Sequence, residues 1–265
     1  MKNIALLLFL VSLSLTAFGQ KSKVVSAYNY LKYDELDKAV SYIDEAAEHP
    51  STSNMAKTWY YRGLIYQKTF NHEKYGSLVE NPLMEALNSY NKALEIDPKY
   101  EYKKEIDQNR QKIAADMFQA GVDKYTSNDF ADALVYFENY LSINPDDQSA
   151  NLNAALAAQN SENTDKAKKY YKKLISLKVD QPRPYQGLAS IYKAEGDTAA
   201  ALEVVKEGRA AFPADKNLMI EELNIYLSMG QAEEALEITN KAINKDPENA
   251  TLYYVKGSML DNRGR

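Results

Sequence analysis

The chain has 265 residues, and its formal net charge of −5, from 37 acidic and 32 basic side chains, argues against nucleic acid as a partner. It contains no cysteine, which excludes disulfides, thiol catalysis and thiolate metal sites. Tyrosine dominates the aromatic residues, with 21 Tyr against one Trp, and the helical spacing of many of these rings predicts that they fill a core.

Residues Met1–Gly19 have the pattern of a secretory signal peptide. Lys2 gives a positive start, Ile4–Leu15 is apolar but short for a membrane span, and the small residues flanking Phe18 offer a cleavage point before Gln20. The alternative is a retained membrane anchor. We therefore expect an exported protein with no stable membrane insertion after cleavage. The simplest location is the periplasm of a Gram-negative bacterium, with secretion as the alternative.

The next part of the chain predicts two helical pairs, at residues 20–53 and 56–100. The second pair contains an inserted loop at 69–82. A long loop on a rigid scaffold often has a function, whereas the alternative is a tolerated surface insertion. Asn81 is expected to cap the following helix, with Pro82 in its first turn.

A charged stretch without glycine or proline then leads into the third pair, at residues 114–147. It predicts one long first helix that begins at Tyr100, continues through Gly121 and protrudes beyond the normal unit. Its apolar stripe is thin, with only Ile106 and Ile113. The stripe favours a solvated extension over a spacer or dimerisation edge.

From residue 114 the pattern repeats every 34 residues. The units are 114–147, 148–181, 182–215, 216–249 and a partial one at 250–265. One small residue recurs in each second helix, at Ala133, Ala167, Ala201 and Ala235. A small side chain lets two helices pack closely. One turn later comes a filler residue, at Phe137, Tyr171, Val205 and Thr239.

The turns between the paired helices keep the same spacing, at Asn128, Glu162, Gly196 and Gly230. Glycine at two of them indicates a left-handed backbone that ends the first helix. Gly264 falls in the same register, so the chain ends where a second helix should begin. The last helix is apolar on more than one side, so either the native protein continues beyond Arg265 or this helix meets a partner.

One stretch matches a known repeat motif of large and small residues. The matching positions are Trp59, Gly63, Tyr66, Ala86, Tyr90, Ala93 and Pro98. The chain thereby resembles the tetratricopeptide repeat (TPR) family, although Arg62 stands where that family usually has leucine. The resemblance implies an all-α, right-handed solenoid of tandem helix-turn-helix repeats over residues 20–265. It leaves the partner open, because such repeats serve many partners.

The sequence offers no reaction centre, so we expect no enzyme activity, no cofactor and no metal. His49 precedes a proline at a helix end and His72 lies in the inserted loop; neither has a second histidine at ligand spacing. Acidic pairs near turns suit helix starts. Trp59 is expected to be buried and structural.

In TPR-like stacks the first helices line a concave groove, and the residues on its inner face are the candidate partner-binding residues. These are Tyr60, Gln119, Tyr125, Asn153, Gln186, Ser190, Lys193 and Asn224. Asn153, Gln186 and Asn224 could form a row of amides that binds an extended peptide backbone, or be ordinary solvated residues. The family's clamp for a C-terminal carboxylate is not aligned here.

These features predict an exported scaffold or adaptor that binds a protein or peptide in this groove. One alternative is a periplasmic holdase chaperone for unfolded outer-membrane proteins. Another is the non-catalytic repeat part of a longer enzyme or glycan-binding protein.

Overall fold

The computed structural model describes residues 21–248 and 250–263. The expected signal peptide, Met1–Gly19, and the turn at Gly264 lie outside the described residues. Every regular element within them is an α-helix, and none is both long and apolar enough to cross a membrane. Contacts divide the chain into two compact units, with the boundary between Gln119 and Ala120.

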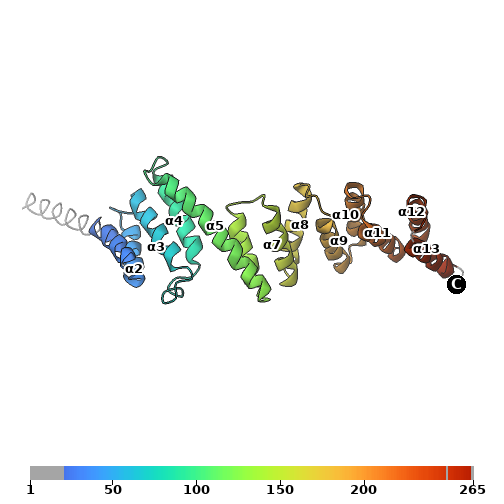
Figure 1. Cartoon of the computed structure of the whole chain (residues 1–265), viewed down its shortest axis with the longest axis horizontal. Helices are drawn as coiled ribbons and strands as arrows, with labels where there is room; N and C mark the ends of the chain where they lie inside the picture. Colours follow the sequence, from blue (N-terminus) through green and yellow to red (C-terminus); the bar gives the residue numbers. More distant parts are fainter. Residues whose placement is uncertain (1–20, 249, 264–265) are drawn as a thin grey trace, which may run out of the picture. The chain divides into compact units, whose positions relative to one another are not determined.

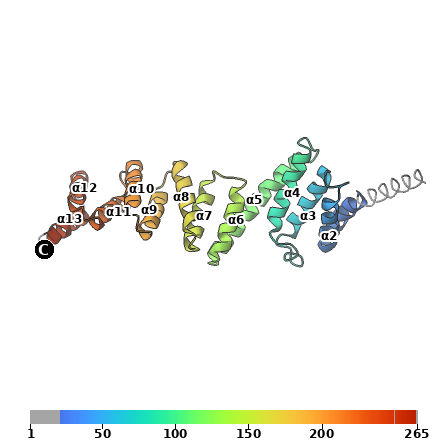
Figure 2. The same cartoon turned by 180° about the vertical axis from the view of Figure 1, so that it is seen from behind.

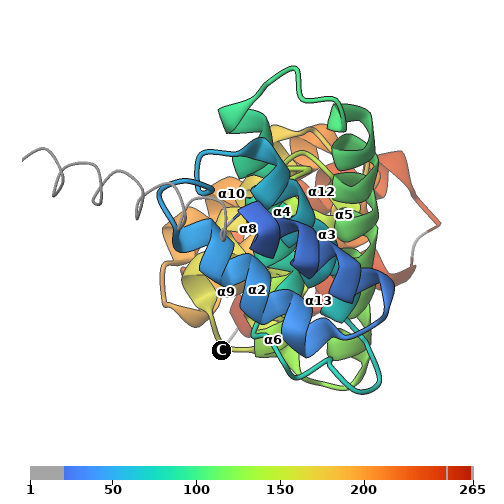
Figure 3. The ribbon, with the colours of Figure 1, turned by 90° about the vertical axis from the view of Figure 1, so that its left-hand side faces the viewer.

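The first unit begins with helical residues 21–32 and continues through three complete helices. They are α2 (Leu36–Glu48), α3 (Ala56–Thr69) and α4 (Pro82–Ile96). Figure 3 views this unit from its amino-terminal side, with α2 in front of α3 and α4. Helix α5 (Lys103–Thr126) begins in the first unit and ends in the second.

The second unit consists of successive antiparallel neighbours that are visible from both sides (Figure 1, Figure 2). Its helices after α5 are α6 (Phe130–Leu141), α7 (Gln148–Asn160), α8 (Thr164–Ser176), α9 (Arg183–Ala194), α10 (Thr198–Ala211), α11 (Lys216–Ser228), α12 (Ala232–Lys245) and α13 (Ala250–Arg263). Several begin at an Asp or Asn whose side chain accepts a backbone N–H, as Asp147 does from Ala150 at 2.8 Å.

The 34-residue spacing predicts the core of the second unit correctly. Ala133, Ala167, Ala201 and Ala235 are all completely buried, and so are the filler residues that follow them one turn later. Each alanine therefore lies where two helices come closest.

The predicted turns are also confirmed. Asn128, Glu162, Gly196 and Gly230 all have positive φ, between 59° and 80°. The left-handed residue ends one helix and reverses the chain into the next.

The prediction of a protruding, solvated extension of α5 is wrong. Ile106 and Ile113 are completely buried, and Asn109 donates a hydrogen bond to the Tyr90 hydroxyl on α4 at 3.1 Å. The early turns of α5 therefore cover the α3–α4 pair. The helix begins at Lys103 rather than Tyr100, whose ring is buried in the preceding turn.

The inserted loop between α3 and α4 is tied to the first helical pair. His72 Nε2 lies 3.1 Å from Asp34, which also pairs with Lys68 at 3.0 Å, and the Tyr75 ring is buried beside His72. Asn81 precedes α4 with a left-handed backbone, but its side chain does not cap the helix as predicted.

Candidate binding sites

The first helices of the second unit expose a common surface. Hydrogen bonds join neighbouring first helices: Asn160 on α7 donates to Tyr125 on α5 at 2.9 Å, and Lys193 on α9 pairs with Glu221 on α11 at 2.6 Å. The surface, called here the first-helix face, comprises Tyr125, Asn153, Gln186, Ser190, Lys193, Ile220, Asn224, Leu227 and Tyr254.

The predicted polar residues lie on this face but do not form one row. Ser190 and Asn224 are exposed, whereas Asn153 and Gln186 are half-buried. Gln186 donates its amide to Asp215 at 3.3 Å. Asn153 and Gln186 are 33 residues apart and Gln186 and Asn224 are 38 apart, so the three amides do not occupy equivalent places in the 34-residue repeat.

Sequence reasoning missed two apolar residues on the first-helix face. Leu227 lies 34 residues beyond Lys193, and Tyr254 lies 34 beyond Ile220, so the repeat spacing alone could have found both. Leu227 is 39 % exposed, Ile220 37 % and Tyr254 78 %. The face therefore changes from polar on α9 to apolar on α11 and α13.

The two remaining candidates belong to the first unit. Tyr60 is only 7 % exposed, stacks on Tyr102 and donates its hydroxyl to Glu105 on α5 at 3.1 Å. Burial and this hydrogen bond to the carboxylate raise the pKa of Tyr60. Its place in a groove is therefore corrected to a packing role, because α5 begins early enough to cover it. Gln119 is exposed on α5, at the last position of the first unit.

Arg62 is one of several charged residues that line a cleft of about 490 Å³ between α2, α3 and α4. Its guanidinium lies 2.9 Å from both Asp44 and Glu85 and donates to Tyr66 at 3.1 Å. Trp59 borders this cleft and is only partly buried, with its indole N–H donating to a backbone carbonyl. The departure from the leucine of the repeat motif thus creates a charged network.

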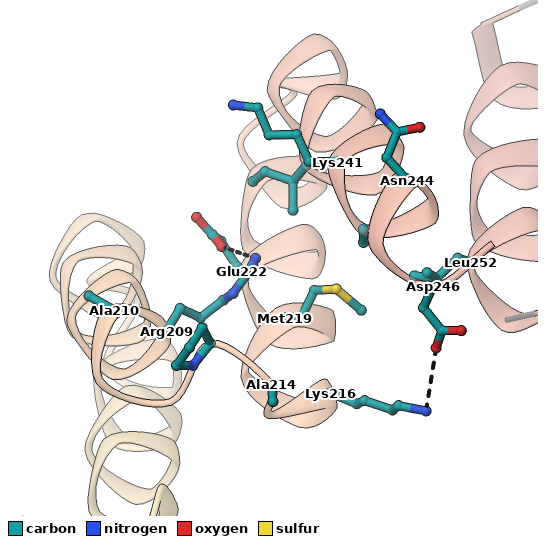
Figure 4. A pocket seen from close by; sticks show the side chains of 13 residues that line it. Arg209, Ala210, Ala214, Lys216, Met219, Glu222, Lys241, Asn244, Asp246 and Leu252 are labelled. Atoms are coloured by element: carbon teal, nitrogen blue, oxygen red, sulfur yellow. Dashed lines mark hydrogen bonds and ion pairs between the residues drawn. The ribbon is translucent and has the colours of Figure 1, made fainter.

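A larger pocket of about 960 Å³ lies in the second unit and is lined by residues of α10, α11, α12 and α13. Figure 4 shows Met219 in its middle, the ion pair of Arg209 with Glu222 on one side and that of Lys216 with Asp246 on the other. The Arg209–Glu222 distance is 2.7 Å, and Glu222 is buried. We call this cavity the α11 pocket.

Glu222 has the same position in its repeat as Arg62. Glu222 directly precedes Leu223, and Arg62 directly precedes Gly63, and both of these following residues pack at a helix crossing. Sequence reasoning noted Arg62 but missed Glu222. A charged residue at a position that holds Leu188 in the preceding repeat was the available signal.

Among residues 21–248 and 250–263, no three acidic or histidine side chains gather in a way that could hold a metal ion. His72 contacts Asp34, and His49 contacts Ser51 at 2.9 Å. Both histidines thus have local partners near turns.

Several solved structures are similar to the chain at the level of the fold. MamA is 20 % identical with a TM-score of 0.48, over 57 % of this chain and 82 % of MamA. PilW, a type IV pilus biogenesis factor, is 20 % identical with a TM-score of 0.44, over 89 % of this chain and 97 % of PilW. YrrB, a TPR protein with an unusual peptide-binding site, is 16 % identical with a TM-score of 0.46, over 62 % of this chain and 84 % of YrrB.

No curated protein matches the sequence significantly. The model of the tetratricopeptide repeat family matches residues 125–191 and 192–258, together just over half of the chain. These segments contain the turns and helix crossings described above for the second unit. The chain therefore belongs to the tetratricopeptide repeat family.

Proposed function

We propose that the protein is an exported, non-catalytic scaffold that binds a peptide or helical segment of a partner protein on the first-helix face of its second unit. The proposal rests on one observation. Ile220, Leu227 and Tyr254 expose large apolar side chains on this face, although the opposite faces of α11 and α13 are buried. An exposed apolar patch with polar neighbours is typical of a protein-binding surface.

The composition of the face suggests the kind of segment that it binds. Ser190 and Lys193 on α9 suit polar contacts, whereas Ile220, Leu227 and Tyr254 suit apolar side chains. A partner helix or extended peptide with a polar and an apolar part would match both. Because the helices form the surface before binding, the ordering cost of binding is low on the side of the scaffold.

Photo-crosslinking in the native cell tests this proposal. A photoreactive side chain at Asn224 should crosslink one envelope protein reproducibly, and one at Ser190 should crosslink the same protein. Val135 is the matched control, because it is also exposed but lies on the second helix α6. Equal crosslinking from Val135 and Asn224 would contradict binding at the first-helix face. Crosslinks to many unrelated unfolded proteins would favour a holdase instead.

The proposed export rests on the apolar stretch near the amino terminus, Ile4–Leu15, and on the small residues that follow it. Intact mass and amino-terminal sequencing of the protein from its natural source test it. We expect a chain that begins at Gln20 in the periplasmic fraction. A cytoplasmic protein that retains Met1 would contradict export. A mature mass well above that of residues 20–265 would favour the repeat part of a longer protein.

A further inference from the structure

We propose that α13 is a homodimerisation surface, on which the α13 helix of a second copy of this chain packs in the opposite direction. One side of the helix has four exposed residues, called here the α13 stripe: Ala250, Tyr253, Gly257 and Leu260. Tyr253 is 48 % exposed and Leu260 is 49 % exposed. The α13 stripe shares no residue with the first-helix face, so this inference goes beyond the proposed function.

The opposite side of α13 packs within the second unit, where α13 lies beside α12 (Figure 1). Leu252 and Met259 are buried, and Met259 belongs to a cluster with Leu223 on α11 and Ala235 on α12. At 100° per residue, the α13 stripe lies along the side of the helix that faces away from Leu252 and Met259. Because its residues are exposed, no helix among the described parts of the chain covers this side.

Other helical glycines of this chain show what packs against such a surface. A Cβ on Gly63 would lie 2.4 Å from the ring of Tyr90, and a Cβ on Gly121 would lie 2.7 Å from the ring of Phe137. Both rings come from the next helix along the chain, α4 or α6. Gly257 has the same place in its repeat as Gly121, since the two are four 34-residue periods apart, but nothing lies within 4 Å of a Cβ there. The glycine of α13 therefore lacks the aromatic ring that its counterparts have.

A second α13 helix supplies this ring, because the spacing of the α13 stripe is the same in both directions. Its residues follow one another at intervals of three, four and three positions. When two stripes run antiparallel, Ala250 of each copy lies opposite Leu260 of the other, and Tyr253 of each copy lies opposite Gly257 of the other. A small residue thus meets a large one in every contact, and each tyrosine ring covers a glycine.

A parallel arrangement of the two helices would fit less well. It would place Tyr253 against Tyr253 and Gly257 against Gly257, which crowds two rings at one level and leaves a void at the next. The antiparallel pair also has the two-fold symmetry of most homodimers, in which both copies use the same surface. The sizes and the spacing of the α13 stripe therefore select a second copy as the occupant and an antiparallel direction.

Sedimentation velocity of the full mature chain, residues 20–265, tests the proposal without any other protein. Between about 5 and about 500 μM we expect a reversible monomer–dimer equilibrium with a dissociation constant in the micromolar range. The affinity is modest because the α13 stripe spans about three helical turns, and specific interfaces below about 1,200 Å² are weak.

Two outcomes of this experiment would overturn the proposal. A monomer at every concentration would leave the α13 stripe for a helix of a different protein. Assemblies that grow beyond a dimer would indicate a head-to-tail contact between unlike surfaces in place of the two-fold pair.

Gly257→Ala is the decisive variant, because the single chain has open space for the new Cβ whereas the dimer does not. The added methyl group would meet a Tyr253 ring twice in the symmetric dimer, so we expect dimerisation about tenfold weaker or more, with an unchanged fold. Tyr253→Ala should weaken dimerisation as well. Tyr33→Ala is its matched control, since it removes a 76 % exposed tyrosine from the first unit. Equal dimerisation of the Tyr253→Ala and Tyr33→Ala variants would overturn the proposal.

An exchange of sizes within the α13 stripe tests the contact itself. Gly257→Tyr alone would place two rings against each other and should abolish the dimer. The double variant that adds Tyr253→Ala again places a small residue opposite each ring, so it should recover dimerisation. A double variant that is no better than Gly257→Tyr alone would contradict the assigned contact.

Disulfide trapping tests the antiparallel register, and the absence of cysteine from the chain makes it specific. Copies with Tyr253→Cys are mixed with copies with Gly257→Cys and oxidised. Because a disulfide needs Cα atoms within about 7 Å of each other, we expect the mixture to form crosslinked dimers faster than either variant alone. Faster crosslinking of Gly257→Cys with itself would overturn the antiparallel pair.

Discussion

The two units place their first helices in different surroundings, although both are built from helical pairs. In the first unit α5 begins early and buries Tyr60, and the departure from the repeat motif at Arg62 is compensated by Asp44 and Glu85. In the second unit the 34-residue period is kept and the alanines of the second helices are buried. The side chains of the first-helix face on α11 and α13 remain exposed.

This difference teaches that the spacing of the repeats decides which side chains are available for binding. A regular unit buries one side of each first helix and leaves another side open. An extended helix that covers its neighbour converts the same register position into core. A binding residue that is inferred from its position in the repeat is therefore a good candidate only where the neighbouring repeats keep the 34-residue period.

The largest expected effect comes from Ala201→Arg in the second unit. It inserts a long charged side chain at Ala201 on α10, which is completely buried in a cluster with residues of α9 and α11. We expect a loss of roughly 3 kcal/mol or more in the free energy of unfolding, measured by chemical denaturation. The control Ala199→Arg changes an exposed position on the same helix and should alter stability by less than about 0.5 kcal/mol. Similar losses in the two variants would contradict the assigned helix crossing.

Gly63→Ala in the first unit ranks next. The new Cβ would lie 2.4 Å from the ring of Tyr90, which is completely buried and has little room to move. We expect a destabilisation of about 2 kcal/mol, after allowing for the better helix propensity of alanine. Unfolding of the first unit can be followed by the fluorescence of Trp59, the single tryptophan.

Gly257→Ala is the counterpart of that change in the second unit. Nothing lies within 4 Å of a Cβ at Gly257 on α13, so the substitution should be neutral or stabilise by up to about 1 kcal/mol. The two glycines differ in the space around them, which is filled at Gly63 and open at Gly257. A large loss of stability from Gly257→Ala, or none from Gly63→Ala, would contradict this difference.

Substitution of Arg62 tests the compensated charge of the first unit. Arg62→Ala leaves Asp44 and Glu85 without their shared cation and should cost about 1–2 kcal/mol. The effect is smaller than for a fully buried pair, because both carboxylates remain more than a third exposed. Arg62→Leu restores packing but not charge and should cost less than Arg62→Ala. An equal or larger cost for leucine would show that packing is not limiting there.

The smallest effect concerns pH and the inserted loop of the first unit. Hydrogen bonds from Lys68 and then His72 lower the pKa of Asp34 in the folded protein. The folded state therefore binds this proton less tightly than the unfolded chain. The stabilising contribution is complete above the ordinary aspartate pKa of about 4 and is lost as pH falls through the lowered folded value.

Hydrogen exchange of the loop amides measures this effect, because the Gly76 amide is bonded to His72 within the loop. Intrinsic exchange slows as pH falls, so the measured quantity is the protection of the loop amides relative to the intrinsic rate, and this protection should decrease at acidic pH. Asp34→Asn should have fast exchange already at neutral pH and lose most of the additional dependence. Identical profiles for the two proteins would show that Asp34 does not anchor the loop.

The repeat spacing predicted the parts of the fold that depend on local register. It predicted the turns at Asn128 and Gly230 and the buried positions Ala133 and Ala235, because equivalent residues make equivalent contacts in each repeat. The exposed residues Ser190 and Asn224 follow in the same way.

The remaining features depend on contacts between residues that share no period. Tyr60 is buried because Tyr102, just before α5, and Glu105, in the first turn of α5, lie against it, and no spacing rule predicts that approach. The α11 pocket likewise appears only when α10, α11 and α12 are packed against one another, because its lining comes from all three helices.

Hydrogen–deuterium exchange of the full chain, with and without the partner that Asn224 crosslinks, tests most directly whether the first-helix face is the binding surface. We predict that bound partner slows exchange in α9, α11 and α13 and leaves α3 and the second helices α6 and α8 unchanged. Protection confined to the first unit, or spread equally over first and second helices, would contradict the account.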